Sequence, residues 1–267
     1  MTAEAYSVFR TFPAAPRCEF LFDRHYLLYS AAGSMRLEAE GKVWALPPAR
    51  AAFIAAGRPI QVTLPQKVIA CSVLFDAAFI PHPAATLTVV NMSPLARELV
   101  LHCGAWTDPD ASLDPYGRQL FLALAAVVAR LTTTPSRAAM PAPRSAGLAR
   151  ALSLTEQRIA AAPDFETIAA EVAMTPRSLA RRFAAEMGMT WRQALRRLRM
   201  IRALELLAED TASVTETAFA VGYTSLSAFN AAFLEFVGET PSSYRQGLSG
   251  AGNVRLKAQE GLASERM

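Results

Sequence analysis

The sequence has few of the residues that build metal sites and disulfide frameworks. Its 267 residues include three cysteines and three histidines, and the cysteines lie far apart without a CxxC pair. This scarcity argues against a zinc site or a disulfide framework and favours a reducing cytoplasm. The longest apolar run, residues 120–128, is too short to span a bilayer. No signal-peptide pattern opens the chain, so we expect a cytoplasmic protein without a membrane partner.

Lysine is also rare, since only three of the 27 basic side chains are lysines and the rest are arginines. The net charge of +4 fits a polyanionic partner only weakly, because many enzymes share such a charge. The distribution of the arginines is more informative. Eight arginines and a single acid, Glu186, lie between Arg177 and Arg202. A local excess of this kind is the electrostatic pattern expected of a surface that contacts phosphate groups.

The first half of the chain has the pattern of a β-rich module. Between about Arg17 and Val90, strands are expected at residues 25–30, 34–40, 42–46, 51–55, 60–64 and 67–75. Strands this short and close together predict an antiparallel sandwich or a small barrel, with a hairpin turn at Gly41-Lys42. Two flanking helices should follow, at residues 94–106 and from residue 115 to about 131.

The segment from residue 132 to 147 separates the two halves of the chain. It is rich in Thr, Ser and Pro, as interdomain linkers are. We therefore expect a sensor or dimerisation domain at residues 1–131 and a helical domain at residues 148–246. Residues 247–267 lack a sustained apolar face, which predicts a disordered tail. The fold class expected is α+β, with the strands and the helices in separate domains.

A repeat in the second half carries the functional signal. One segment contains Ala169, Ala173, Leu179 and Phe183, and a second segment contains Ala218, Gly222, Phe229 and Phe233 at almost the same spacing. A small residue, a tight turn and a helix with apolar residues at i and i+4 are typical of a helix-turn-helix. Two tandem copies therefore predict a protein that reads double-stranded DNA.

The first copy should place its reading helix at residues 176–187, after a supporting helix at residues 165–173. Asp164 and Thr175 are the expected N-caps. Leu179 and Phe183 should face the core. The outward residues, which are candidates for contact with DNA, are Arg177, Ser178, Ala180, Arg181 and Arg182. Arginine can read a guanine bidentately or bind a phosphate, and both remain open for Arg177 and Arg181.

A long helix from Trp191 to about residue 209 should connect the two copies. One of its faces is apolar, and Arg192, Arg196 and Arg199 form another face that we expect to contact phosphates. The second copy should have Ser213 as the N-cap of a supporting helix at residues 214–221. Its reading helix is expected at residues 225–237 with Thr224 as the N-cap. The outward candidates there are Leu226, Ser227, Asn230 and Ala231, none of which is basic.

These residues resemble the AraC family of bacterial transcription regulators. The second copy, ETAFAVGYTSLSAFNAAFLEFVGETPSSYR, is similar to the signature of that family, and LARRFAAEMGMTWRQALRRLRMIRALELL in the first copy is similar as well. The resemblance covers about residues 148–245 and implies seven helices, two of them reading helices. The base-contacting positions that it implies are Arg177, Ala180, Arg181, Ser227 and Ala231. Many members carry arginine where Ala231 stands.

The first half resembles, more loosely, the cupin-like sensor of the same family. Metal-binding cupins carry paired histidines, whereas the matching region here has Phe20, Phe22 and Ile60 and leaves His25 alone, with His82 and His102 outside the barrel. We therefore expect no metal and no cofactor. The family resemblance also implies RNA polymerase as a partner, leaves a small-molecule effector and a homodimer open, and favours activation over repression.

Three hypotheses about function follow from these patterns. The first is a DNA-binding regulator whose β module senses an effector. The second is a DNA-binding regulator whose β module only dimerises or binds a protein partner. The third is a cupin-type enzyme fused to a DNA-binding domain, which the shortage of histidine disfavours, so we expect no enzymatic activity.

Overall fold

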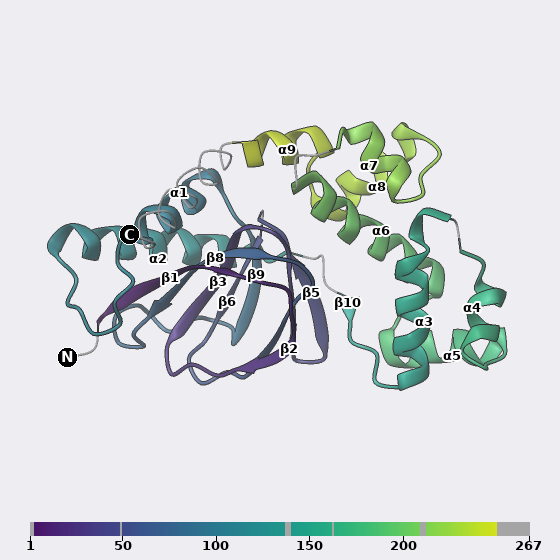
Figure 1. The fold of residues 1–267 in the computed structure, drawn as a ribbon, viewed down its shortest axis with the longest axis horizontal. Coiled ribbons are helices and arrows are strands. Elements are labelled where there is room, and N and C mark those ends of the chain that lie inside the picture. The colour runs from purple at the N-terminus through teal and green to yellow at the C-terminus, as the bar shows by residue number, and fades with distance from the viewer. Residues whose placement is uncertain (1–2, 49, 137–139, 162, 209–211, 250–267) are drawn as a thin grey trace. The chain divides into compact units, whose positions relative to one another are not determined.

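The computed structural model describes residues 3–48, 50–136, 140–161, 163–208 and 212–249 (Figure 1). Contacts between Cα atoms divide these residues into two compact units. The N-terminal unit consists mainly of residues up to 37 and of residues 46–136, and the C-terminal unit consists of residues 38–45 and of described residues from 140 to 245. Strands dominate the first unit and helices the second, which confirms the expected α+β class.

Hydrogen bonds join the strands into two sheets. The strands are β1 (Ala5–Phe12), β2 (Ala15–Phe20), β3 (His25–Ala32), β4 (Met35–Ala39), β5 (Lys42–Leu46), β6 (Arg50–Ile54), β7 (Ile60–Leu64), β8 (Val68–Phe75), β9 (Leu87–Asn91) and β10 (Met140–Pro141). One sheet has the order β1-β8-β3-β6-β9, and the other has the order β10-β5-β4-β7-β2. Within the first sheet every neighbouring pair is antiparallel, as expected from the short strands.

Two helices cover one face of the first sheet. They are α1 (Pro94–Cys103) and α2 (Pro115–Thr132), and each begins at a proline that follows a capping Ser or Asp. Alternate residues of the strands, such as Leu27 and Tyr29 of β3, pack with Phe121 and Leu124 of α2 in one buried cluster. The inward face of the sheet and the apolar face of α2 therefore form a single core.

The sequence patterns predicted the six strands β3 to β8 and missed β1, β2, β9 and the short β10. Strands β5 and β7 have the expected bounds, whereas β1 lies before the region that the pattern assigned to strands. β1 pairs with β8 along its whole length, from Ala5 opposite Phe75 to Phe12 opposite Val68. The hairpin turn lies one residue earlier than expected, because Glu40 and Gly41 are the residues with positive φ, at 51° and 71°. Helix α1 also ends at Cys103 and not at Trp106.

Helices make up the described C-terminal unit almost entirely. They are α3 (Ala146–Gln157), η1 (Ile159–Ala161), α4 (Phe165–Glu171), α5 (Pro176–Met187), α6 (Trp191–Ala208), α7 (Val214–Ala220), α8 (Leu226–Val237) and α9 (Pro241–Ser249). The bounds of α5 match the expectation at both ends. The supporting helices α4 and α7 end one or two residues earlier than expected, because the chain turns at Ala173 and Gly222.

Part of the expected linker has a defined structure. Met140 and Pro141 pair with Val43 and Lys42 of β5, and Met140 is buried in the core of the C-terminal unit. Ser145 caps α3, which begins at Ala146, two residues before the expected start of the helical domain. Residues 137–139 of the linker and residues 250–267 of the expected tail lie outside the described residues. The domain boundaries therefore stay a prediction.

Candidate DNA-binding surface

The first helix-turn-helix, α4 with α5, is built by local capping. Asp164 accepts a hydrogen bond from the backbone N–H of Thr167 at 2.8 Å, and Thr175 accepts one from the N–H of Ser178 at 3.2 Å. Pro176 occupies the first turn of α5, and Gly188 ends this helix in the left-handed conformation. The turn between the helices passes through Ala173, whose φ of 54° is uncommon for a residue with a side chain.

The second helix-turn-helix, α7 with α8, repeats this construction with one extra residue. Ser213 and Glu216 form a reciprocal capping box on α7. Gly222 takes the place of Ala173 with a φ of 80°, and Gly238 ends α8 as Gly188 ends α5. The turn is longer by one residue, so the N-cap of α8 is Ser225 and not Thr224 as expected. The spacing difference in the repeat is thus confined to this turn.

The two reading helices share one buried frame. Leu179 and Phe183 of α5, and Phe229 and Phe233 of α8, are all fully buried. In both helices these residues stand four apart, so the same face is turned inward. A residue of α5 therefore corresponds to the residue fifty positions later in α8, and the outward faces can be compared residue by residue.

Helix α5 presents two arginines outward in its first two turns. Arg177, Ala180 and Arg181 are exposed, and neither arginine forms an ion pair within the described part of the chain. Ser178 differs from the expectation, because it is only half-exposed and its N–H is bound by the cap Thr175. Arg182 is exposed, but its guanidinium lies 3.7 Å from the carboxylate of Glu186.

The arginines of α6 differ more from one another than the sequence indicated. Arg192 is exposed and forms no ion pair among the described residues. Arg196 forms a 2.5 Å ion pair with Glu235 of α8. Arg199 donates from Nη2 to the carbonyl of Ile159 at 3.1 Å and lies 5.7 Å above the ring of Tyr223.

Burial explains the role of Arg199. Its pKa is lowered by desolvation, although an arginine remains charged at any physiological pH. This side chain packs η1 against the turn of the second helix-turn-helix, and the expected phosphate contact of Arg199 stays a prediction. The sequence could not show this, because Ile159 and Tyr223 are distant in the chain.

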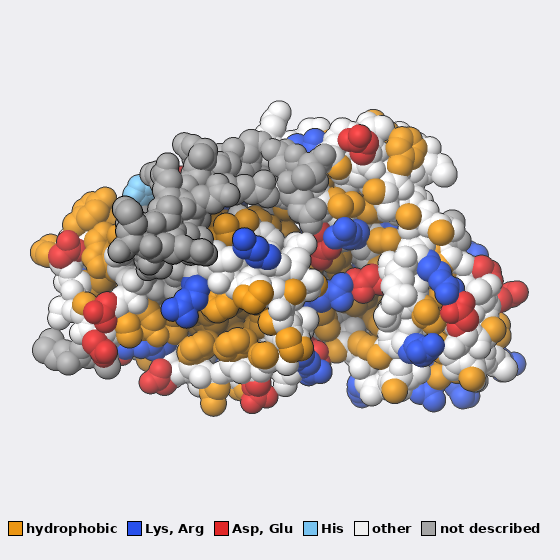
Figure 2. Space-filling view, in the orientation of Figure 1, with side chains coloured by type: hydrophobic (Ala, Val, Ile, Leu, Met, Phe, Trp, Pro, Cys, Tyr) orange, Lys and Arg blue, Asp and Glu red, His pale blue; other side chains and the backbone are white. Residues whose placement is uncertain are grey.

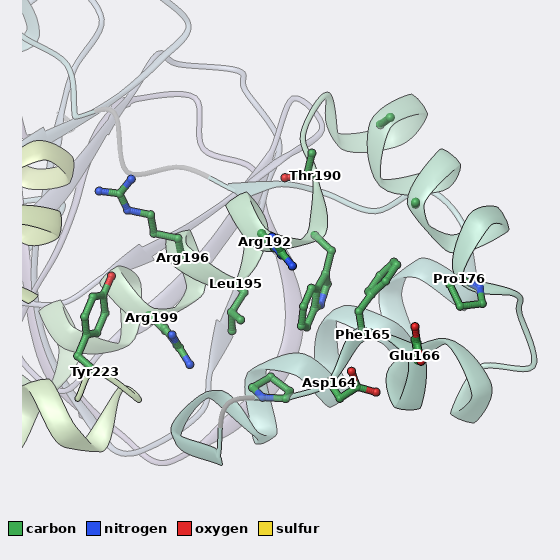
Figure 3. A pocket seen from close by; sticks show the side chains of 14 residues that line it. Asp164, Phe165, Glu166, Pro176, Thr190, Arg192, Leu195, Arg196, Arg199 and Tyr223 are labelled. Atoms are coloured by element: carbon green, nitrogen blue, oxygen red, sulfur yellow. The ribbon is translucent and has the colours of Figure 1, made fainter. Parts of the chain in front are cut away.

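A groove of about 860 Å³ runs along one flank of α5. Figure 3 shows Phe165 and Glu166 of α4 across from Arg192 and Leu195 of α6, with Arg199 beside Tyr223. The lining residues come from α4, α5, α6 and the turn before α8, and they are Pro163, Asp164, Phe165, Glu166, Pro176, Ala180, Ala184, Thr190, Trp191, Arg192, Leu195, Arg196, Arg199 and Tyr223. The candidate residues Ala180, Arg192 and Arg196 therefore share one concave surface.

The fold lowers the charge excess that the sequence window indicated. Two acids from outside that window reach it, since Glu205 pairs with Arg202 at 2.9 Å and Glu235 pairs with Arg196. In Figure 2 basic and acidic side chains are interspersed over the C-terminal unit. Arg177, Arg181 and Arg192 are the arginines of the window best able to meet a phosphate or a base.

Helix α8 presents an uncharged surface at the equivalent positions. Ser227, Asn230 and Ala231 are exposed, as expected, and Leu226 and Leu234 are exposed beside them. Helix α8 also carries Glu235, which pairs with Arg196. The sequence pattern did not indicate this pair, because the two residues lie 39 positions apart.

Known proteins with similar sequences are named as helix-turn-helix transcriptional regulators. A family model described as a helix-turn-helix domain matches residues 168–247. The transcriptional regulator NimR of Escherichia coli is 27% identical over 222 residues, which cover 82% of this chain and 78% of NimR. The transcriptional activator RhaS of Escherichia fergusonii is 35% identical over 92 residues, which cover 34% of this chain and 33% of RhaS. Residues 168–247 are therefore similar to the helix-turn-helix domain of AraC-type transcriptional regulators.

Solved structures also show similarity to part of this chain. A DNA-binding transcriptional dual regulator of Escherichia coli K-12 is 28% identical, with a TM-score of 0.38, and the alignment covers 41% of this chain and 97% of that one. No helix in the described ranges is long and apolar enough to cross a membrane.

The histidines of the N-terminal unit are arranged differently from the expectation. His25 is buried, and its Nδ1 accepts a hydrogen bond from the N–H of Ala56 at 3.1 Å. It does not stand alone, because the ring of His82 lies 5.2 Å away. Burial and the neighbouring His82 lower the pKa of His25. No group of three or more His, Cys, Asp or Glu able to hold a metal occurs among the described residues.

The cysteines do not form disulfides within the described residues. Cys71 and Cys103 are buried, and burial raises the pKa of each thiol to about 12. Cys18 is exposed. The two buried thiols stay protonated at neutral pH and belong to the core of the N-terminal unit.

Proposed function

We propose that this chain is an AraC family regulator that reads its target mainly through α5, with Arg177 and Arg181 contacting bases or phosphates in the major groove. The observation that carries this proposal is the pair of exposed arginines, one turn apart, on the first two turns of a reading helix. Ala180 lies between them on the same outward face. Residues in these turns reach base edges when a recognition helix enters the groove.

Helix α6 sets the separation of the two reading helices in this proposal. Its 18 residues extend about 27 Å, and with the adjoining turns this length fits two neighbouring major-groove segments, about 34 Å apart. Arg192 is then a phosphate contact, and Arg196 is a contact that must first exchange its partner Glu235. Ser178, Arg182, Ser227, Asn230 and Ala231 complete the proposed DNA surface.

For the N-terminal unit we propose a cupin-like module at residues 1–131 that responds to a small molecule. It is joined by residues 132–147 to a seven-helix DNA-binding domain at residues 148–246. The two sheets and the apolar core of the N-terminal unit support a binding or dimerising module. We further propose an activator that acts with RNA polymerase in the cytoplasm and has no enzymatic activity. The name of the related activator RhaS favours activation.

The selection of bound genomic fragments tests the DNA-reading proposal most economically. Full-length protein is incubated with sheared DNA from its own host at physiological salt, and the bound fragments are sequenced. We expect one shared motif with two segments centred about 10 base pairs apart. Fragments without a shared motif would show that binding is only electrostatic and would contradict the proposal.

Two further assays separate the hypotheses about the N-terminal unit. Titration of candidate effectors against binding to the selected site distinguishes a sensor from a module that only dimerises. Metal analysis of the purified protein distinguishes both from a cupin-type enzyme. A stoichiometric metal would favour the enzyme and contradict our expectation.

A further inference from the structure

The outward face of α8 carries an apolar stripe with one amide in the middle. Leu226, Asn230 and Leu234 follow one another at four-residue intervals, so they lie along one line of the helix. Leu226 is 38% exposed and Leu234 is 47% exposed. Ser227 and Ala231 form the neighbouring line and are exposed as well.

The outward positions of α8 correspond to the outward positions of α5, which the proposed function places against DNA. With the offset of fifty residues, Leu226, Asn230 and Leu234 match Pro176, Ala180 and Ala184, which line the groove beside α5. Ser227 and Ala231 match Arg177 and Arg181. The stripe therefore lies on the side of α8 that would face the major groove if α8 is the second reading helix. The first two turns of α8 contain Leu226, Ser227, Asn230 and Ala231.

The charge of this face neither attracts nor strongly repels a nucleic acid. Helix α8 contains no Lys or Arg, so its attraction to phosphate groups is weak. Its one acid, Glu235, is paired with Arg196 and adds little repulsion. The face is thus close to neutral, and the arginines of α5 and α6 supply the attraction to the backbone.

The side chains present on α8 select one kind of base pair. An apolar side chain gains contact with the C5-methyl group of thymine, and an asparagine side chain can form two hydrogen bonds with adenine. Guanine is read by arginine, which α5 has and α8 lacks. The two reading helices therefore carry complementary chemistry.

We propose that α8 reads an A·T segment of the target, with Asn230 on an adenine and with Leu226 and Ala231 on thymine methyl groups. This inference rests on the proposed function, since it assumes that α5 holds the neighbouring major-groove segment. The target is then bipartite, with a guanine-containing segment under α5 and an A·T segment under α8.

Removal of the thymine methyl groups from the α8 segment of the DNA tests this inference. The selected site is synthesised with deoxyuridine in place of every thymine of the α8 segment, which keeps base pairing and removes only the C5-methyl groups. The affinity of the full-length protein should fall by about fourfold for each thymine in contact, the value of one buried methyl group. The same replacement in the α5 segment serves as the control and should change affinity by less than twofold.

Two variants complete the experiment. Leu226→Ala should weaken the dependence on thymine methyl groups, since Ala231 still contacts one, and Asn230→Ala should relax the preference for adenine at one position. Leu95→Ala on α1 is the matched control, because Leu95 is also an exposed leucine. Folding of each variant is checked by circular dichroism.

The outcomes distinguish this inference from the proposed function. If no shared motif is selected at all, the proposed function fails. If a motif is selected but deoxyuridine acts equally in both segments, or the α8 segment accepts G·C pairs, only the A·T inference is overturned. It is also overturned if Leu226→Ala preserves DNA binding while it abolishes transcriptional activation, since the stripe would then contact a protein.

Discussion

The residues with positive φ in the two helix-turn-helix turns differ in how much side chain their surroundings allow. Ala173 and Gly222 occupy equivalent positions with positive φ, but only the second is a glycine. A Cβ atom built on Gly222 would collide with the carbonyl oxygen of Ile159 and would lie 2.7 Å from Nη2 of Arg199. Gly222 is therefore required for close packing as well as for its backbone conformation, whereas Ala173 only bears the strain of its φ.

The variant Gly222→Ala should lose about 2–4 kcal/mol of unfolding free energy, from the left-handed backbone and the collision together. Gly188→Ala is the matched control, because Gly188 has a φ of 64° and no atom within 4 Å of a built Cβ. It should lose only about 1–2 kcal/mol. Urea unfolding measures both values, and equal losses would contradict the packing role of Gly222.

The variant Glu235→Gln should strengthen DNA binding, because it frees Arg196 for a phosphate group. We expect the slope of log affinity against log salt to steepen by about one unit. Glu98→Gln on α1 removes the same charge from another exposed site and should leave the slope unchanged. An unaltered slope for Glu235→Gln would mean that Arg196 does not approach the DNA.

At the scale of the helices, Glu186 fixes the start of α3 to α5. Its carboxylate accepts hydrogen bonds from the N–H groups of Arg144 and Ser145, both at 2.8 Å, and from the hydroxyl of Ser145 at 2.7 Å. These bonds, the hydroxyl first, lower the pKa of Glu186. A lowered pKa in the folded state gives stability above the ordinary pKa of a glutamate, and this stability is lost as the pH falls through the folded value.

The variant Glu186→Ala should therefore lose about 1–3 kcal/mol of unfolding free energy at pH 7, as expected for hydrogen bonds to a charged group. The difference from the unmodified protein should shrink when urea unfolding is repeated near pH 3. Glu166→Ala, which removes an exposed acid from α4, should cost less at pH 7. A loss that does not depend on pH would contradict the role of the Glu186 carboxylate.

Local chemistry explains which helices the sequence predicted correctly. The bounds of α5 follow from Thr175-Pro176 at one end and Gly188 at the other, and these signals act within a few residues. The start of α8 was misplaced by one residue, because Thr224 and Ser225 are both good N-caps and only the packing of the turn decides between them. The sequence predicts that a helix has an N-cap in this place, but it does not decide between two adjacent residues that can both serve as the cap.

Contacts between distant residues explain what the sequence could not show. Strand β1 pairs with β8 more than fifty positions away, and no turn signal marks its start. The tie from Arg199 to Ile159 and the pair of Arg196 with Glu235 each join residues about 40 positions apart. The sequence identified the arginines of α6 as a charged face, but only the folded chain shows which of them are already engaged.

At the scale of the whole molecule, each unit has its own core. Among the described residues, the C-terminal unit buries Phe183, Leu179 and Trp191 with Met140, and the N-terminal unit buries a cluster that includes Leu27 and Phe121. A domain with its own core can fold alone. The C-terminal unit should therefore fold without the N-terminal unit.

Deletion of residues 1–131 should leave a folded DNA-binding fragment with a helical circular dichroism spectrum and a cooperative thermal transition. A second fragment that begins at Gly147 lacks the buried Met140 and the partners of Glu186, so it should melt at a lower temperature. An unfolded longer fragment would reject the proposed domain boundary.

The central claim is that α5 leads in the recognition of DNA. The most direct measurement compares the affinity of Arg181→Ala for the selected site and for random DNA, with Arg130→Ala on α2 as the charge-matched control. We predict that Arg181→Ala lowers affinity for the selected site about tenfold or more and lowers affinity for random DNA much less, which is the result expected of base readout. Equal losses on both DNAs would contradict the claim.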